Sequence, residues 1–151
     1  MKICFAASSG GHFEQLMMLF DLMTSHSSFI ITEKTNYDTN TKGIKKYELS
    51  QINRKEMFFI LKFIVIFFKS LKIFFEEKPD VIISTGALST VPILLIGKIF
   101  KKKIIFIESF SKINSPTITG RIMYKIADLF IIQWEELRKF YPKAVYGGGI
   151  Y

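Results

Sequence analysis

The sequence predicts an α/β fold, a Rossmann-like parallel sheet with helices on both faces, on the strength of two observations. Short and nearly continuous apolar runs alternate along the chain with segments of helical periodicity. Strands of this kind are typical of parallel sheets, because helices bury both faces of such sheets. No repeat or linker divides the 151 residues, so we expect one domain over residues 1–151.

Three strands and two helices are expected in the first half of the chain. Apolar runs predict strands at residues 2–7, 28–33 and 47–50, and the polar residues 34–43 predict a loop. Helical spacing of apolar residues predicts a first helix over residues 13–23. A long helix is expected over about residues 54–77, and it ends before Pro79 because the residue preceding a proline disfavours the helical conformation.

The second half repeats the alternation of strand and helix. Strands are expected at residues 80–85, 102–109 and 128–133, with a last one before the glycine run at 147–149. A helix over residues 88–100 carries Pro92 near its first turn, where proline is tolerated. A helix over residues 115–127 is expected to have Ser115 as its cap and Pro116 at its first position, and a short helix at 135–141 stops at Pro142.

The composition indicates a polyanionic partner and a reducing compartment. The formal net charge is +8 with a pI of about 9.5, which favours nucleic acid or anionic lipid headgroups. The single cysteine, Cys4, excludes an intrachain disulfide and is expected to be a buried apolar residue. The sequence opens directly on a strand-like run without the pattern of a signal peptide, so we expect the protein in the cytoplasm.

The first strand runs into the sequence SSGGH, Ser8–His12, which is the first candidate site. It lacks the glycine spacing of dinucleotide-binding loops and the Lys-Ser/Thr pair of a P-loop. A strand–Gly-Gly–helix turn can nevertheless hold a phosphate or carboxylate on backbone amides, and His12 can act as a general base or a hydrogen-bond donor. A plain capping turn with an incidental histidine explains the same residues equally well.

Polar or small residues also follow other predicted strands. They lie at Thr85–Ala87, Glu108–Phe110 and Gln133–Trp134. Because ligands of parallel α/β sheets bind at the carboxyl ends of the strands, we expect these segments and Ser8–His12 to form one working face.

The long helix is more apolar than packing on a sheet requires. Lys55, Lys62 and Lys69 share one narrow stripe, which Lys72 and Glu76 widen, and roughly 260° of the surface is left apolar. Lysines inside the segment argue against a bilayer span and favour a helix lying in the plane of an anionic membrane surface. The residues expected to contact the membrane are Phe58, Phe59, Lys62, Phe63, Phe67, Lys69 and Lys72. A buried core helix or a protein interface is the alternative.

Three segments together resemble one family over essentially the whole chain. They are SSGGH, STGALSTVPI, and FIESFSKINSPTITGRIMYKIADLFIIQWEELRKFYPKAVYGG. They are similar to the membrane-docked subunit of the split UDP-N-acetylglucosamine transferase of eukaryotic lipid-linked oligosaccharide synthesis, the asparagine-linked glycosylation subunit-fourteen family. Bacterial relatives are enhancer subunits encoded with capsule and exopolysaccharide genes. The pattern also resembles the N-terminal half of MurG.

The resemblance implies the acceptor-side half of a GT-B glycosyltransferase divided between two polypeptides. A donor-binding subunit would be the heterodimer partner, and the pair would transfer a sugar from a UDP-sugar to a polyprenyl-pyrophosphate-linked acceptor in capsular or exopolysaccharide synthesis. The implied location is the cytoplasmic face of the cell membrane, held peripherally. Eukaryotic members carry an amino-terminal membrane anchor, whereas this sequence starts at its first strand, so membrane contact is expected to rest on the long helix and the basic surface.

The resemblance also suggests roles for single residues. His12 is the candidate base; Glu108 is the alternative base, or else a rim carboxylate paired with Arg121 or a lysine. Residues expected to bind acceptor or phosphate are Ser9, Gly10, Gly11, Thr85, Gly86 and Ser109. Residues expected at the partner interface are Trp134, Gly147, Gly148, Gly149, Ile150 and Tyr151.

Two other classes of function compete with this one. A stand-alone single-domain glycosyltransferase would need a second wall for its cleft, which one Rossmann-like layer does not supply. A basic nucleic-acid-binding module would explain the charge of +8, but the lysines are interleaved with aliphatic residues and no binding motif is present, so we expect no nucleic-acid partner. We expect neither a cofactor nor a metal.

Overall fold

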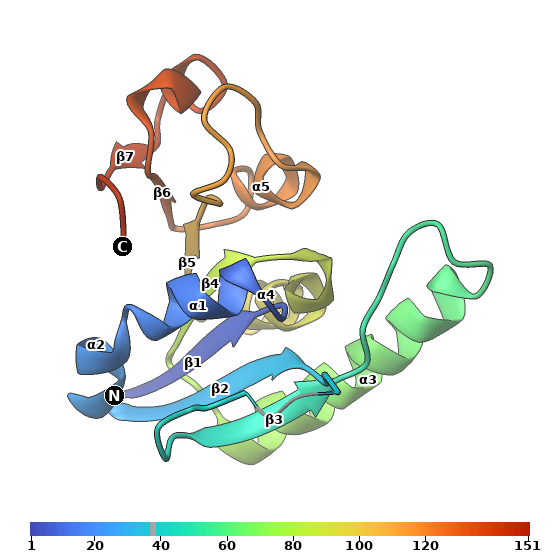
Figure 1. The fold of residues 1–151 in the computed structure, drawn as a ribbon. Coiled ribbons are helices and arrows are strands. Elements are labelled where there is room, and N and C mark those ends of the chain that lie inside the picture. The colour runs from blue at the N-terminus through green and yellow to red at the C-terminus, as the bar shows by residue number, and fades with distance from the viewer. Residues whose placement is uncertain (37–38) are drawn as a thin grey trace.

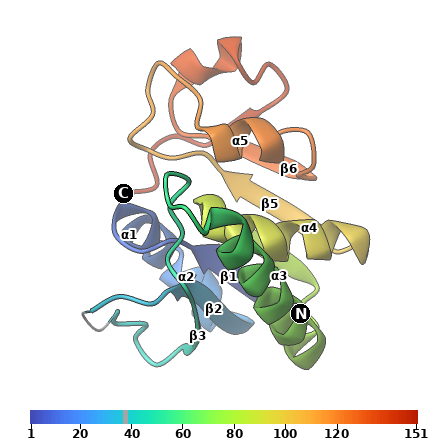
Figure 2. The same cartoon turned by 90° about the vertical axis from the view of Figure 1, so that its right-hand side faces the viewer.

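The computed structural model describes residues 1–36 and 39–151 and contains one parallel sheet. Its seven strands lie in the order β3-β2-β1-β4-β5-β6-β7, and every neighbouring pair is parallel. Helices cover both faces of the sheet (Figures 1 and 2). The predicted α/β class with a doubly covered parallel sheet is therefore confirmed. Positions 37 and 38 of the expected loop lie outside the described residues.

The observed strands match the predicted apolar runs closely. The bounds are β1 Lys2–Ala7, β2 Ser27–Glu33, β3 Lys45–Leu49, β4 Val81–Gly86, β5 Lys103–Ile107, β6 Leu129–Ile132 and β7 Val145–Tyr146. The helices are α1 Gly11–Met17, α2 Phe20–Thr24, α3 Phe59–Glu77, α4 Val91–Ile99 and α5 Ile118–Met123, with short 3-10 helices at Leu88–Thr90 and Glu135–Lys139.

Three predicted helices needed correction. The segment 13–23 is not one helix: it breaks at Met18 and Leu19, whose amides bond to carbonyls three residues back. The long helix begins at Phe59 rather than near residue 54, because residues 53–58 form turns in which the Asn53 side chain accepts from the Lys55 amide. The cap of α5 is Thr117, whose hydroxyl accepts from the Gly120 amide at 2.7 Å, and not Ser115. Pro116 therefore precedes the cap and is not the first helical residue.

Two apolar clusters lie on opposite faces of the sheet. One contains Phe13, Leu16 and Met23 from α1 and α2, and the other contains Ile66 and Ile93 from α3 and α4. Figure 2 shows α3 and α4 side by side on the second face. Burial on both faces explains why the strand sequences lack an alternation of polar and apolar residues.

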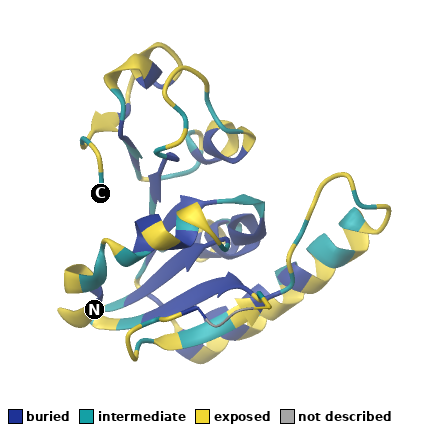
Figure 3. Cartoon of the chain, in the orientation of Figure 1, coloured by how far each residue is buried: buried dark blue, intermediate teal, exposed yellow. Residues whose placement is uncertain are grey.

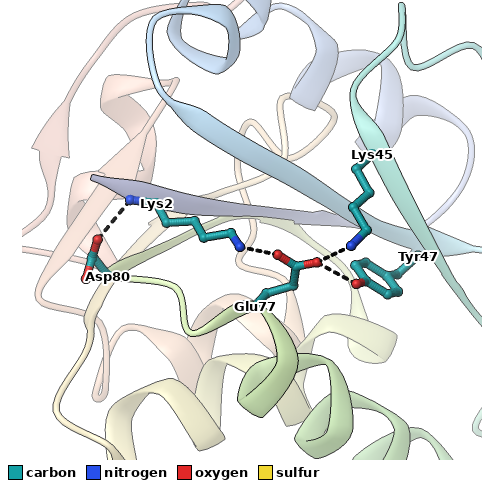
Figure 4. A network of polar contacts seen from close by, with 5 residues as sticks. All are labelled: Lys2, Lys45, Tyr47, Glu77 and Asp80. Carbon is teal, nitrogen blue, oxygen red and sulfur yellow. Dashed lines mark hydrogen bonds and ion pairs between the residues drawn. The ribbon is translucent and has the colours of Figure 1, made fainter.

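A buried carboxylate joins the end of α3 to two strands (Figure 4). Glu77 pairs with Lys2 of β1 and accepts from Lys45 Nζ and the Tyr47 hydroxyl of β3, each at 2.5 Å. Burial alone raises the pKa of Glu77, but the hydrogen bonds from Lys2, Lys45 and Tyr47 outweigh it and lower that pKa to about 2. The backbone amide of Lys2 also donates to Asp80 at 2.8 Å. The network fixes α3 against the amino-terminal half of the sheet.

Candidate functional site

The loop after β1 is held against the end of β4, as the strand-end argument predicted. The Ser8 amide donates to the Gly86 carbonyl at 2.8 Å, and the Thr85 hydroxyl donates to the His12 carbonyl at 2.7 Å. His12 Nδ1 lies 2.7 Å from the Thr85 carbonyl oxygen. Gly86 has φ +100°, and a Cβ atom there would lie 3.2 Å from the His12 ring, so this contact requires glycine.

The partner of His12 determines which ring nitrogen carries the proton. A carbonyl oxygen only accepts, so Nδ1 is the donor in this contact. In the neutral ring Nε2 then carries the lone pair and is able to take a proton. In its neutral form, the half-buried His12 therefore has the tautomer that a general base requires, while the Thr85 carbonyl fixes its orientation.

A carboxylate that the sequence analysis did not single out lies beside the same loop. The Ser9 hydroxyl donates to Glu33 Oε2 at 3.1 Å, and the Ser9 amide lies 3.4 Å from the same oxygen. Glu33 is the last residue of β2 and is 9% exposed. The sequence contained a signal for Glu33, because this residue ends a predicted strand at the same edge of the sheet as Ser8–His12 and Thr85–Ala87.

Glu108 lies beneath the surface and not on a rim. It is fully buried, and its carboxylate accepts from the Thr117 hydroxyl at 2.8 Å, the Tyr141 hydroxyl at 2.6 Å and the Ser109 amide at 2.9 Å. The expected ion pair with Arg121 or a lysine is wrong, since the hydrogen-bond partners among the described residues are neutral. A cavity of only about 30 Å³ separates the carboxylate from His12 and Gly86. This geometry favours a structural role, because both oxygens already have donors.

Burial and the Glu108 carboxylate together raise the pKa of Tyr141, which therefore stays protonated as a donor. The Tyr141 ring in turn packs against Phe130, with ring centroids 4.6 Å apart. The Glu108 network thus ties β5 to the α5 segment and to the loop after β6.

The residues at 147–151 reach the same edge of the sheet. The Ile150 amide donates to the Gln133 side chain at 2.9 Å, and Gln133 donates to the Glu108 carbonyl at 2.8 Å. Tyr151 contacts the Phe110 ring at 5.1 Å between centroids, and its hydroxyl lies 3.4 Å from the Gly11 carbonyl. Trp134 donates to the Phe110 carbonyl at 2.7 Å. The structure therefore brings the expected interface residues and the His12 loop together.

An open pocket of about 280 Å³ lies between these two groups. Its lining is Gly11, His12, Gln15, Ser109, Phe110, Ser111 and Tyr151. A larger hollow of about 700 Å³ lies over α5 and the segment around Tyr141, away from the His12 loop. Of these two hollows, the smaller one adjoins the strand-end residues, so a ligand bound there would meet the polar groups at this edge. The described residues contain no group of three or more acidic, histidine or cysteine side chains placed to hold a metal ion.

The outer surface of α3 is apolar and exposed. Its exposed apolar residues, together with Met57 and Phe58 just before it, form what we term the α3 apolar face: Met57, Phe58, Ile60, Leu61, Ile64, Val65, Phe68 and Phe75. Phe75 contacts Phe100 at 5.2 Å between centroids, so the face continues onto the exposed residues Ile99 and Phe100 at the end of α4. Figure 3 shows that exposure runs along α3.

The residues expected to contact the membrane differ in their exposure. Phe58, Lys69 and Lys72 are exposed, whereas Lys62 and three phenylalanines are half-buried: Phe59, Phe63 and Phe67. In the part of the chain that the structure describes, no helix combines the length and the apolar character needed to cross a membrane.

A family model for oligosaccharide biosynthesis proteins like Alg14 matches residues 3–150. The chain belongs to the Alg14-like family. The human UDP-N-acetylglucosamine transferase subunit ALG14 is 26% identical over 181 aligned residues, covering 99% of this chain and 83% of the human protein. The Saccharomyces cerevisiae subunit is 41% identical over 56 residues, which cover 36% of this chain. The resemblance seen in SSGGH and the later motifs is thereby confirmed at the level of the family.

Solved structures support the same fold for this Alg14-like chain. MurG from Acinetobacter baumannii superimposes with a TM-score of 0.70 at 14% identity, over 87% of this chain and 41% of MurG. The UDP-N-acetylglucosamine 2-epimerase from Rickettsia bellii gives a TM-score of 0.78 at 14% identity, over 99% of this chain and 45% of the epimerase. The chain thus spans less than half the length of these enzymes, and at such identities the likeness concerns the fold alone.

Proposed function

We propose that this chain is the acceptor-side, non-donor-binding subunit of a two-component glycosyltransferase. It recruits a donor-binding subunit to the cytoplasmic face of the cell membrane, where the pair transfers a sugar from a UDP-sugar to a polyprenyl-pyrophosphate-linked acceptor in capsular or exopolysaccharide synthesis. One observation carries the proposal. The chain belongs to a family whose human member is a transferase subunit, and its fold superimposes on less than half of MurG, with the strand-end edge open.

The arrangement at that edge supports an acceptor role. His12 presents Nε2 with a free lone pair, and Ser9, Thr85 and Gly86 hold the loop that carries it. A base in this position would remove the proton from an acceptor hydroxyl as it attacks the sugar of the donor. The donor would enter from the partner subunit, which forms the opposite wall of the cleft. Glu108 supports the loop of Ser109 from beneath and is not assigned a proton-transfer role.

The α3 apolar face supports peripheral attachment to a membrane. Exposed aromatic and aliphatic residues lie beside the exposed Lys69 and Lys72, which is the arrangement of an in-plane amphipathic helix. Flotation with vesicles containing anionic lipid tests this part. Substitution of both Ile64→Asp and Phe68→Asp should lower vesicle binding at least ~10-fold, because each side chain loses its apolar burial. The exposed Ile113→Asp variant is the matched control, and equal loss in both variants would contradict the assignment.

The segment 147–151 supports docking of the partner. Tyr151 is 59% exposed and lies over the same edge as His12, so a second protein that closes the cleft would contact it. Co-expression with a donor-binding glycosyltransferase subunit and co-purification through a tag on this chain tests the interface. Deletion of residues 147–151 should abolish association, whereas full retention of the partner would refute the role of this segment.

A further inference from the structure

Gln15 places an unused hydrogen-bond donor in the wall of the pocket beside His12. The residue is 2% exposed and lies in α1, one turn after His12. Its side-chain Nε2 has no hydrogen-bond partner among the described residues. Buried amides are nearly always satisfied, so an open one that lines a pocket indicates a ligand group that accepts from it.

The other polar groups of the pocket are hydroxyls rather than charges. The hydroxyls of Ser109 and Ser111 lie 2.9 Å apart, and each retains further hydrogen-bonding capacity. No lysine, arginine, aspartate or glutamate lines the pocket. A phosphate at this point would have no lysine or arginine in the lining to pair with. The lining therefore suits a neutral ligand with several hydroxyl groups.

Two aromatic rings complete the pocket. Phe110 and Tyr151 meet edge to face, with centroids 5.1 Å apart, and both line the space. Aromatic rings supply apolar area for the C–H faces of a pyranose, while its hydroxyls take the amide and serine partners. The volume of about 280 Å³ equals that of about nine waters at ~30 Å³ each. That space is large enough for one hexose ring with its hydroxyls.

We propose that Gln15, Ser109, Ser111, Phe110 and Tyr151 form a monosaccharide subsite in which the Gln15 amide donates to a sugar hydroxyl or ring substituent. The identity of the bound sugar rests on the proposed function: the subsite holds the sugar of the lipid-linked acceptor next to His12. Gln15 is then a positioning and specificity residue: it holds the sugar so that a hydroxyl faces Nε2 of His12.

The sole tryptophan provides a direct readout. Trp134 packs on Phe110 with centroids 4.9 Å apart, so its fluorescence responds to a ligand on that ring. The full chain is titrated with methyl glycosides of glucose, galactose and N-acetylglucosamine, and separately with inorganic phosphate. We expect a saturable change with at least one glycoside. A change with phosphate alone, or no saturable change with any probe, overturns the subsite.

Variants separate binding through Gln15 from general effects. Gln15→Ala should weaken glycoside binding about 5–10-fold, the effect of one lost hydrogen bond. Gln51→Ala, at an exposed glutamine, is the matched control and should bind as wild type. Circular dichroism shows whether Gln15→Ala folds. Ser111 is exposed, so Ser111→Phe fills the pocket without disturbing the core and should abolish glycoside binding. Wild-type binding by folded Gln15→Ala or by Ser111→Phe refutes the subsite.

Transfer assays with the partner subunit distinguish this inference from the proposed function. If glycosides bind through Gln15 but the two-subunit complex transfers no sugar, the subsite stands and the proposed function fails. If the complex is active and Gln15→Ala leaves the KM for the lipid-linked acceptor unchanged, the subsite fails and the proposed function stands. We expect a raised KM for the acceptor with an unchanged KM for the UDP-sugar.

Discussion

Replacing Glu77 with glutamine removes the charge that joins α3 to β1 and β3. The Glu77 side chain is 6% exposed, whereas those of its partners Lys2 and Lys45 are 35% and 62% exposed. The lowering of the Glu77 pKa from 4.5 to about 2 corresponds to at most about 3 kcal/mol. Solvent screening at the two lysines reduces this, so we expect Glu77→Gln to lower the free energy of unfolding by about 1–2 kcal/mol at neutral pH.

The sign of the pH dependence follows from the direction of the pKa shift. Because the folded-state pKa of Glu77 lies below the unfolded value, the stabilisation is fully present above about pH 4.5 and is lost as the pH falls toward 2. The difference in unfolding free energy between wild type and Glu77→Gln should therefore be constant near neutral pH and shrink across that acidic window. Other carboxylates titrate there too, but they contribute equally to both proteins.

Urea unfolding followed by circular dichroism measures this difference at a series of pH values. Glu76→Gln is the matched control, since its carboxylate is 47% exposed and pairs with Lys72 only at 3.8 Å. That variant should lie within ~0.5 kcal/mol of wild type. The reasoning is refuted if Glu77→Gln and Glu76→Gln have the same stability, or if the deficit of Glu77→Gln does not change between neutral and acidic pH.

Two further substitutions test the site and its support. His12→Ala should lower sugar transfer ~10²-fold or more while the two-subunit complex still assembles; His26→Ala is the control, and wild-type turnover in His12→Ala would defeat the base assignment. Gly120→Ala places a Cβ 1.9 Å from Glu108 Oε2 and should lower the free energy of unfolding by at least ~2 kcal/mol. Gly11→Ala, whose Cβ meets no atom within 4 Å, is its control, and equal thermal stability of the two variants would contradict the packing around Glu108.

The strands were predictable because local sequence decides them. The runs KICFAA and SFIITE have no polar alternation, and burial of β1 and β2 on both faces is the reason. The carboxyl ends of the predicted strands also placed the segments of His12 and Thr85 on one face, although the two residues are separated by 73 positions. The rule that ligands bind at the carboxyl ends of parallel strands placed both segments on one face, and the contact itself is seen only in the structure.

Helix boundaries and buried carboxylates were set by tertiary contacts instead. Thr117 caps α5 in place of Ser115 because its hydroxyl also donates to Glu108, a residue on a different strand. Glu77 and Glu108 are charged residues whose partners lie up to 75 positions away, and no local pattern reports such partners. Gln15 was missed because a glutamine on a short amphipathic helix ordinarily faces solvent.

Reconstituted sugar transfer tests the central claim most directly. The purified chain, a donor-binding partner subunit and their mixture are each supplied with a UDP-sugar and a polyprenyl-pyrophosphate-linked acceptor in anionic vesicles, and glycosylated lipid is measured. We expect product only from the mixture, with no tight binding of the UDP-sugar by this chain alone. Transfer by the isolated chain, together with tight binding of the nucleotide sugar, would contradict the division of the site between two polypeptides.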